Sequence, residues 1–114
     1  MKRFVTPGDI YVCDFGEQYG SVQCGERMSI VVDNAYAGAY SSVIHVVPLT
    51  SQIKDMRLHY LLTKERYNFL ESDSMALCEQ YQLIDKDQLK NKVGSLEITD
   101  IYEIVIKSKQ NFPF

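Results

Sequence analysis

The sequence predicts a small α+β domain in which a strongly curved antiparallel sheet, or a partly open barrel, is closed by a C-terminal helix. Short apolar runs separated by turn residues predict several strands, and helical spacing of apolar residues occurs only near the C-terminus. Neither a repeat nor a linker interrupts the 114 residues. Since this length is typical of one domain, we expect a single domain over residues 1–114.

The first expected strand covers residues 9–14. Ile10 and Val12 fall on one side of such a strand, and Tyr11 and Cys13 fall on the other. This period of two is typical of a strand with one buried face.

Two further strands are expected at residues 27–33 and 43–49, because both segments carry nearly continuous runs of Val, Ile and Leu. Such runs are typical of strands buried on both faces. Residues 15–25 contain three glycines among polar residues and are expected to form a turn-rich loop. Residues 34–42 are rich in Ala, Gly and Ser and are expected to form a mobile connection.

The second half of the chain adds strands over residues 58–62 and 74–81. Asp85 and the polar residues after it predict one capped helical turn.

A single amphipathic helix is expected to begin after Ser95, which is a suitable N-cap residue. Its apolar face would consist of residues spaced by three and four positions: Ile98, Ile101, Tyr102 and Val105. We expect this helix to lie across the sheet.

The composition limits the classes of function. A net charge of −3 and an isoelectric point near 5.3 argue against a protein that holds nucleic acid by charge alone. The N-terminus lacks the apolar run of a signal peptide, and no segment has the roughly 20 apolar residues of a membrane span. We therefore expect a cytoplasmic protein that does not associate with membranes.

The cysteines and histidines do not form a metal-binding pattern. Cys13, Cys24 and Cys78 are widely spaced and lack a C-x-x-C pair, and His45 and His59 do not complete a zinc motif. Buried, reduced cysteines are the simpler interpretation, and we expect neither a metal nor a cofactor.

Four short blocks, at the expected order and spacing, resemble the MazF/PemK/Kid toxins, and the similarity runs from about residue 7 to residue 107. The blocks are Gly8-Asp9-Ile10-Tyr11, Gly20-Ser21 to Gly25-Glu26-Arg27, Pro48-Leu49-Thr50-Ser51-Gln52, and Ser74 to Gln80 followed by Ile84-Asp85-Lys86 and Leu89. The resemblance implies a CcdB-like or SH3-like barrel and a homodimer. It also implies a sequence-specific, metal-independent endoribonuclease of a type II toxin-antitoxin pair.

The same resemblance implies the partners and the site. Single-stranded RNA would be the substrate, a cognate antitoxin would be the protein partner, and DNA would be bound only by the toxin-antitoxin complex. Arg27 and Thr50 match the family's catalytic positions. Glu26 is a candidate general base, although a glutamate beside an arginine on a loop is more often a solvated charge. The residues expected to bind RNA are Gly20, Ser21, Gln23, Ser51, Gln52, Lys54, Glu79 and Gln80.

The chain departs from the family pattern at Val22, Met28 and Gln82, where a glutamate, a proline and an arginine are usual. These departures leave two alternatives open: a gyrase-type inhibitor that acts on a protein, and a non-catalytic member that binds only an antitoxin.

Several other residues have two possible interpretations. Lys54, Arg57, Lys64 and Arg66 either guide RNA or merely keep the surface soluble. His45 shares strand parity with buried residues and is expected to be a core or interface histidine with its hydrogen bonds satisfied.

Overall fold

Seven strands form one antiparallel sheet in a computed structural model. The structure describes residues 4–17, 25–54 and 56–110. The strands are β1 (Asp9–Asp14), β2 (Glu26–Val31), β3 (Val43–Thr50), β4 (His59–Leu62), β5 (Ser74–Leu77), β6 (Gln82–Asp85) and β7 (Leu89–Ser95). Their order is β4-β5-β3-β2-β1-β7, and β6 also pairs with β3. The sheet does not close, so the expected α+β class with a partly open barrel is confirmed.

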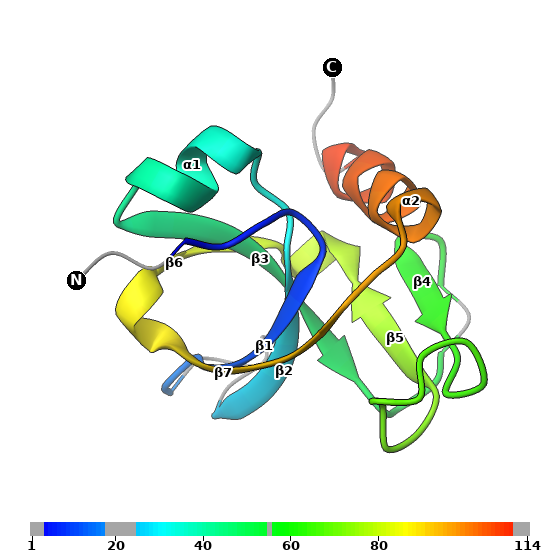
Figure 1. The fold of residues 1–114 in the computed structure, drawn as a ribbon. Helices are drawn as coiled ribbons and strands as arrows, with labels where there is room; N and C mark the ends of the chain where they lie inside the picture. Colours follow the sequence, from blue (N-terminus) through cyan, green and yellow to red (C-terminus); the bar gives the residue numbers. More distant parts are fainter. Residues whose placement is uncertain (1–3, 18–24, 55, 111–114) are drawn as a thin grey trace.

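Strand β3 organises the sheet because each of its halves has a different partner. Its first half, Val43 to Val46, pairs with β6, and its last two residues pair with β5. Strand β2 pairs along its other side. Figure 1 shows the consequence: β1, β2, β3, β6 and β7 curve around one interior, while β4 and β5 continue the sheet to one side.

The core consists of two clusters, one on each face of the central strands. Adjacent residues of one strand belong to different clusters: Ile30 packs in the first and Val31 in the second. The predicted burial of both faces of β2 and β3 is therefore confirmed. The prediction of one buried face for β1 is wrong, because Tyr11 and Cys13 are buried in the second cluster while Ile10 is buried in the first.

Strands β6 and β7 were not predicted. In β6 only Ile84 is buried, and most of β7 is polar, so neither segment shows the apolar alternation that marks a strand in sequence. The predicted strand at 74–81 is shorter, because residues 78–80 form a 3₁₀ turn, η1 (Cys78–Gln80). The capped turn at Asp85 is confirmed as η2 (Lys86–Gln88), where Asp85 and Gln88 form a capping box.

The connection after β2 contains a short helix, α1 (Ala35–Tyr40), instead of the expected irregular segment. Asn34 caps its start, since its Oδ1 accepts a 2.9 Å hydrogen bond from the N–H of Ala37. At the other end, the Nζ of Lys86 donates to the carbonyls of Ala37 and Gly38 at 3.1 and 2.7 Å. The alanines favour a helix once both ends are capped in this way.

We expect Gly38→Ala to destabilise the fold although Gly38 lies in a helix. Helix propensity alone would favour alanine by about 1 kcal/mol. An added Cβ would, however, lie 2.0 Å from the carbonyl oxygen of Val5, and such overpacking costs about 1–3 kcal/mol. The net result is a lower free energy of unfolding, measured by urea denaturation. A more stable variant would contradict this close approach.

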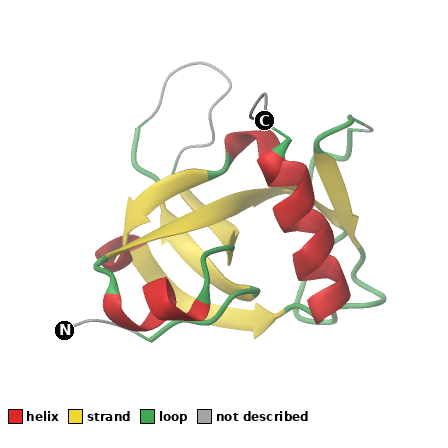
Figure 2. Cartoon of the chain, turned by 90° about the horizontal axis from the view of Figure 1, so that it is seen from above, coloured by secondary structure: helices red, strands yellow, loops and turns green. Residues whose placement is uncertain are grey.

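The C-terminal helix α2 (Ile98–Lys109) packs against β4 and η1. Figure 2 shows it lying across one side of the sheet, as expected. No helix in the described ranges is long and apolar enough to cross a membrane.

Two predicted details of α2 are wrong. Glu97, not Ser95, occupies the N-cap, and the hydroxyl of Ser95 donates to Asp9 Oδ1 at 2.9 Å. The predicted apolar face is wrong at Ile98 and Tyr102, which are 79% and 64% exposed, whereas Ile101 packs against the first core cluster as predicted. The residues that α2 buries are instead Asp100, Ile104 and Ser108.

Asp100 determines which face of α2 is buried. The Oη of Tyr60 donates to its Oδ1 at 2.5 Å, the Nε of Arg66 donates to its Oδ2 at 2.8 Å, and Tyr67 also donates to Oδ2. The helix therefore turns a carboxylate toward donors on β4 and on the segment that follows it. Apolar spacing cannot reveal such a polar anchor.

Candidate active site and adjoining pocket

The start of β2 and the end of β3 lie at the same edge of the sheet because the two strands are antiparallel. Their register pairs Ser29 with Pro48. Continuing this register by two residues places Arg27 opposite Thr50, and directly opposed residues of antiparallel strands point to the same face. The sheet itself therefore brings together two side chains that are 23 positions apart in the chain.

A cavity of about 330 Å³, called here the Arg27 pocket, lies at this edge. Glu26, Arg27, Met28, Leu49, Thr50, Ser51, Glu71, Ser72 and Ser74 line it. It thus combines a guanidinium, several hydroxyls and two carboxylates. Sequence reasoning missed Glu71 and Ser72, which come from the loop before β5 and carry no distinguishing motif.

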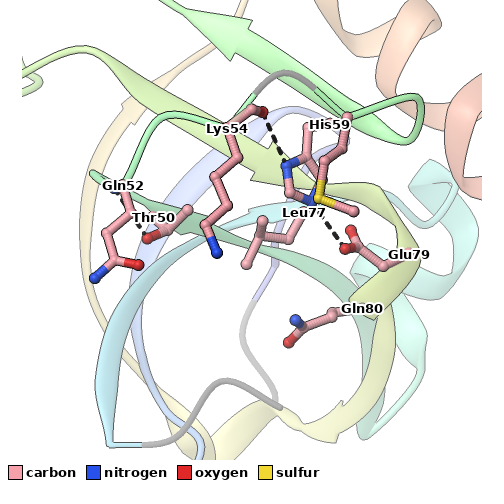
Figure 3. A pocket seen from close by; sticks show the side chains of 8 residues that line it. Thr50, Gln52, Lys54, His59, Leu77, Glu79 and Gln80 are labelled. Carbon is pink, nitrogen blue, oxygen red and sulfur yellow. Dashed lines mark hydrogen bonds and ion pairs between the residues drawn. The ribbon is translucent and has the colours of Figure 1, made fainter. Parts of the chain in front are cut away.

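Thr50 belongs to two cavities. Its Oγ1 accepts a 3.2 Å hydrogen bond from the N–H of Gln52, which leaves the hydroxyl proton available for donation. The second cavity, called here the Glu79 pocket, has a volume of about 440 Å³. It is lined by Thr50, Gln52, Lys54, Met56, His59, Leu77, Glu79 and Gln80 (Figure 3).

His59 is a buried polar residue of the Glu79 pocket, and it has a carboxylate partner. Its Nε2 lies 2.8 Å from Oε2 of Glu79, and its Nδ1 lies 3.3 Å from the carbonyl oxygen of Lys54. Figure 3 shows the ring between these two groups. No sequence signal singled out His59, because its partner is 20 residues away.

The two pockets collect all the candidate site residues that the structure describes. Glu26, Arg27, Thr50 and Ser51 line the Arg27 pocket. Gln52, Lys54, Glu79 and Gln80 join Thr50 around the other. The remaining candidates, Gly20, Ser21 and Gln23, lie outside the described residues, as does Val22.

The four basic residues after Thr50 do not form one surface. Only Lys54 lines a pocket that contains Thr50. Arg66 pairs with Glu97 and Asp100, and Lys64 donates to the backbone of Glu71 at 3.3 Å. The Arg66 guanidinium thus anchors α2, and an RNA-guiding role for these basic residues stays a prediction.

His45 lies away from both pockets and has a carboxylate partner of its own. Its Nδ1 is 2.9 Å from Oδ1 of Asp33, so this ring nitrogen has a hydrogen-bond partner, as expected. The side chain is 38% exposed, so His45 is not a core histidine, and a place in an interface stays a prediction. Cys13 and Cys78 are buried thiols that are not joined in a disulfide, while Cys24 lies outside the described residues. Burial raises the pKa of the Cys78 thiol to about 11, so this cysteine is not a nucleophile at neutral pH.

Within the described ranges, no three His, Cys, Asp or Glu side chains are grouped as metal ligands would be. The chemistry that the two pockets offer is that of a cation, hydroxyls, amides and carboxylates.

Residues 6–111 match a family described as the PemK-like, MazF-like toxin of type II toxin-antitoxin systems. The chain belongs to this family. Endoribonuclease EndoA from Bacillus subtilis (strain 168) is 36% identical over 95 residues, which cover 82% of this chain and 81% of EndoA.

Solved structures of the toxin family share the fold. MazF from Deinococcus radiodurans superposes with a TM-score of 0.79 at 18% identity and 94% coverage of each chain. A mycobacterial endoribonuclease in complex with its cognate antitoxin gives 0.76 at 17% identity, covering 96% of this chain and 98% of the other. The expected MazF-like architecture is thereby confirmed.

Proposed function

We propose that this PemK/MazF-like toxin is a sequence-specific, metal-independent endoribonuclease that cleaves single-stranded RNA. The observation that carries the proposal is that Arg27 and Thr50 line one pocket, and that Thr50 also lines a second one. The chain is also similar to EndoA, which is named as an endoribonuclease, and this similarity supports the same activity.

The proposed reaction uses the ribose 2′-hydroxyl as nucleophile. Its oxygen attacks the adjacent phosphorus, the bond from phosphorus to the 5′-oxygen breaks, and the products are a 2′,3′-cyclic phosphate and a 5′-hydroxyl. The hydroxyl proton passes to a base, and the leaving oxygen takes up a proton. Two exposed carboxylates, those of Glu26 and Glu71, line the Arg27 pocket and are the candidate bases.

Arg27 and Thr50 supply charge stabilisation in this scheme. The guanidinium presents several N–H donors to the phosphate oxygens, which gain negative charge in the transition state. The Thr50 hydroxyl donates to another of these oxygens, and the N–H of Gln52 fixes its orientation. Both groups are held by strands, so little reorganisation is needed when the charge develops.

We expect Thr50→Val to lower kcat about 10²-fold, because valine keeps the branched shape and removes the donor. Thr50→Ser keeps a hydroxyl and should retain most of the activity. Single-turnover cleavage of a labelled RNA in excess chelator measures both rates. Equal rates for the valine and threonine proteins would show that the hydroxyl has no part in catalysis.

The departure from the family pattern at Met28 does not disrupt the strand that carries Arg27. Met28 lies within β2, pairs with Val12 of β1 and packs against the first core cluster. Sheet pairing thus fixes the backbone after Arg27 without a proline. Gln82 lines neither pocket. These placements favour a catalytic toxin over a purely binding one.

The proposed partners follow from family membership. A cognate antitoxin would inhibit the toxin, as the mycobacterial complex illustrates for a relative. The sheet is open, and pairing of exposed strand edges favours a homodimer. DNA binding would require the antitoxin, since the toxin itself has a net charge of −3. Action on cellular RNA places the protein in the cytoplasm.

A further inference from the structure

We infer that His59 is a positioning residue, which holds the Glu79 carboxylate so that it selects an RNA base bearing an amino group. This inference rests on the proposed function, because it names what the Glu79 pocket recognises. The His59–Glu79 pair lines the same cavity as Thr50, so a base held there would belong to the RNA segment that is cleaved.

The burial of the two partners suits these different roles. The His59 side chain is 5% exposed, whereas the Glu79 side chain is 32% exposed. The imidazole is thus fixed within the protein, and the carboxylate remains accessible from the pocket. A part-buried hydrogen bond of 2.8 Å to a carboxylate is well suited to hold an otherwise adaptable glutamate in one rotamer.

His59 also connects the two pieces of chain that border the pocket. It begins β4, its Nε2 reaches η1 through Glu79, and its Nδ1 faces the carbonyl of Lys54 in the segment after β3. Both partners are acceptors, so the ring donates a proton in the shorter contact. Removing the ring would release Glu79 and the Lys54 segment together.

The chemistry of Glu79 determines which base it favours. An ionised carboxylate only accepts hydrogen bonds, and Oε2 is already used by His59. The second oxygen suits the exocyclic amino group of adenine, cytosine or guanine, which lies on the Watson–Crick edge that proteins read in single-stranded RNA. Uracil has no amino group, and its single donor there, N3–H, lies between two carbonyl oxygens that repel a carboxylate. The pocket should therefore discriminate against uracil.

The Lys54 and Gln80 side chains complete this recognition site. Figure 3 shows both in the same cavity as Glu79. The Lys54 ammonium offers a charge for a phosphate next to the bound base, and the Gln80 amide offers both a donor and an acceptor for the base edge.

The first test compares cleavage by the parent protein, His59→Ala, His59→Gln and Glu79→Gln. After the cut sequence is mapped on a mixed RNA, oligonucleotides with each base at each flanking position are assayed in chelator. We expect His59→Ala to raise KM about tenfold with little change in kcat, and to lose discrimination against uracil at one position. Glutamine at position 59 can still donate to Glu79 and should restore part of that discrimination.

The matched control is His45→Gln, because His45 also pairs with a carboxylate but lines neither pocket. Its KM and base preference should equal those of the parent. A double variant, His59→Ala with Glu79→Gln, should lose no more discrimination than either single change. Unchanged KM and unchanged base preference in folded His59→Ala would overturn the inference.

Binding of 2′-O-methyl oligonucleotides, which cannot be cleaved by the proposed reaction, separates the two proposals. We expect the parent to bind a mixed-base oligonucleotide at least about tenfold more tightly than an all-uridine one, and His59→Ala to reduce that ratio. Failure of the parent to cleave any RNA, with this difference intact, would refute the nuclease alone. Equal binding of both oligonucleotides by the parent would refute base selection, whatever the cleavage result.

Discussion

Arg27→Ala is expected to reduce kcat/KM for RNA cleavage by about 10²–10³ without loss of the fold. Arg27 is exposed at the first paired positions of β2, so its truncation removes little from the core. It does remove the one guanidinium that lines the Arg27 pocket in the described part of the chain. Single-turnover kinetics in excess chelator measure the loss, and circular dichroism checks the fold.

Arg27→Lys is the matched control for this effect. Lysine keeps a positive charge but loses the planar fork of donors, so its rate should lie between those of the parent and the alanine variant. Cleavage by Arg27→Ala at the parental rate would remove Arg27 from the mechanism. A rate for lysine equal to that of alanine would show that donor geometry, rather than charge, stabilises the transition state.

Asp100→Ala is expected to produce the largest loss of stability, about 2–3 kcal/mol, and to lower Tm by about 10–15 °C. Asp100 is 6% exposed and accepts hydrogen bonds from Tyr60, Tyr67 and Arg66. Its removal leaves the buried hydroxyl of Tyr67 and the partly buried donors of Tyr60 and Arg66 without this acceptor, and it releases the start of α2. The free energy of unfolding from urea titration measures the change.

The pH dependence of stability should report the same cluster. Burial would raise the pKa of Asp100, but donation from Tyr60, Tyr67 and Arg66 outweighs it and lowers that pKa below its ordinary value of 3.8. The stabilisation is therefore complete above pH 3.8 and is lost as the pH falls through the lower folded value. Burial and the neighbouring carboxylate raise the pKa of Tyr60 to about 12, so this tyrosine remains a donor at neutral pH.

The exposed Glu103 lies on the same helix, and Glu103→Ala is the control for Asp100→Ala. Its free energy of unfolding should remain within about 0.5 kcal/mol of the parent. If Asp100→Ala were equally mild, the cluster would contribute nothing net, and apolar packing of α2 would have to explain its docking.

The sequence predicted the strands whose apolar residues are also the residues that the fold buries. The central strands β2 and β3 carry apolar residues on both faces, and both faces are buried. Strand β7 lies at the edge of the sheet and carries the exposed Lys90 and Lys92. Lysines on an edge strand oppose pairing with other chains. They also interrupt the apolar alternation from which a strand is predicted. The face of α2 was misassigned in part, because it combines the buried Asp100 with the apolar Ile101 and Ile104.

The site shows a similar division. Arg27 and Thr50 were found through short blocks of sequence, and the sheet register explains why those blocks meet. His59 carried no signal, because its role depends on Glu79 and Lys54, which only the folded chain brings to it. Contacts between residues of different elements cannot be predicted from the spacing of residues within one element.

The most direct test of the central claim is mass spectrometry of the products formed from a single-stranded RNA in excess chelator. A second substrate carries one 2′-deoxyribose at the cleavage position. We expect a 2′,3′-cyclic phosphate and a 5′-hydroxyl from the RNA, and no cleavage at the deoxyribose, which lacks the attacking 2′-hydroxyl. Products with 3′-hydroxyl and 5′-phosphate ends, or cleavage at the deoxyribose, would contradict attack by the 2′-hydroxyl.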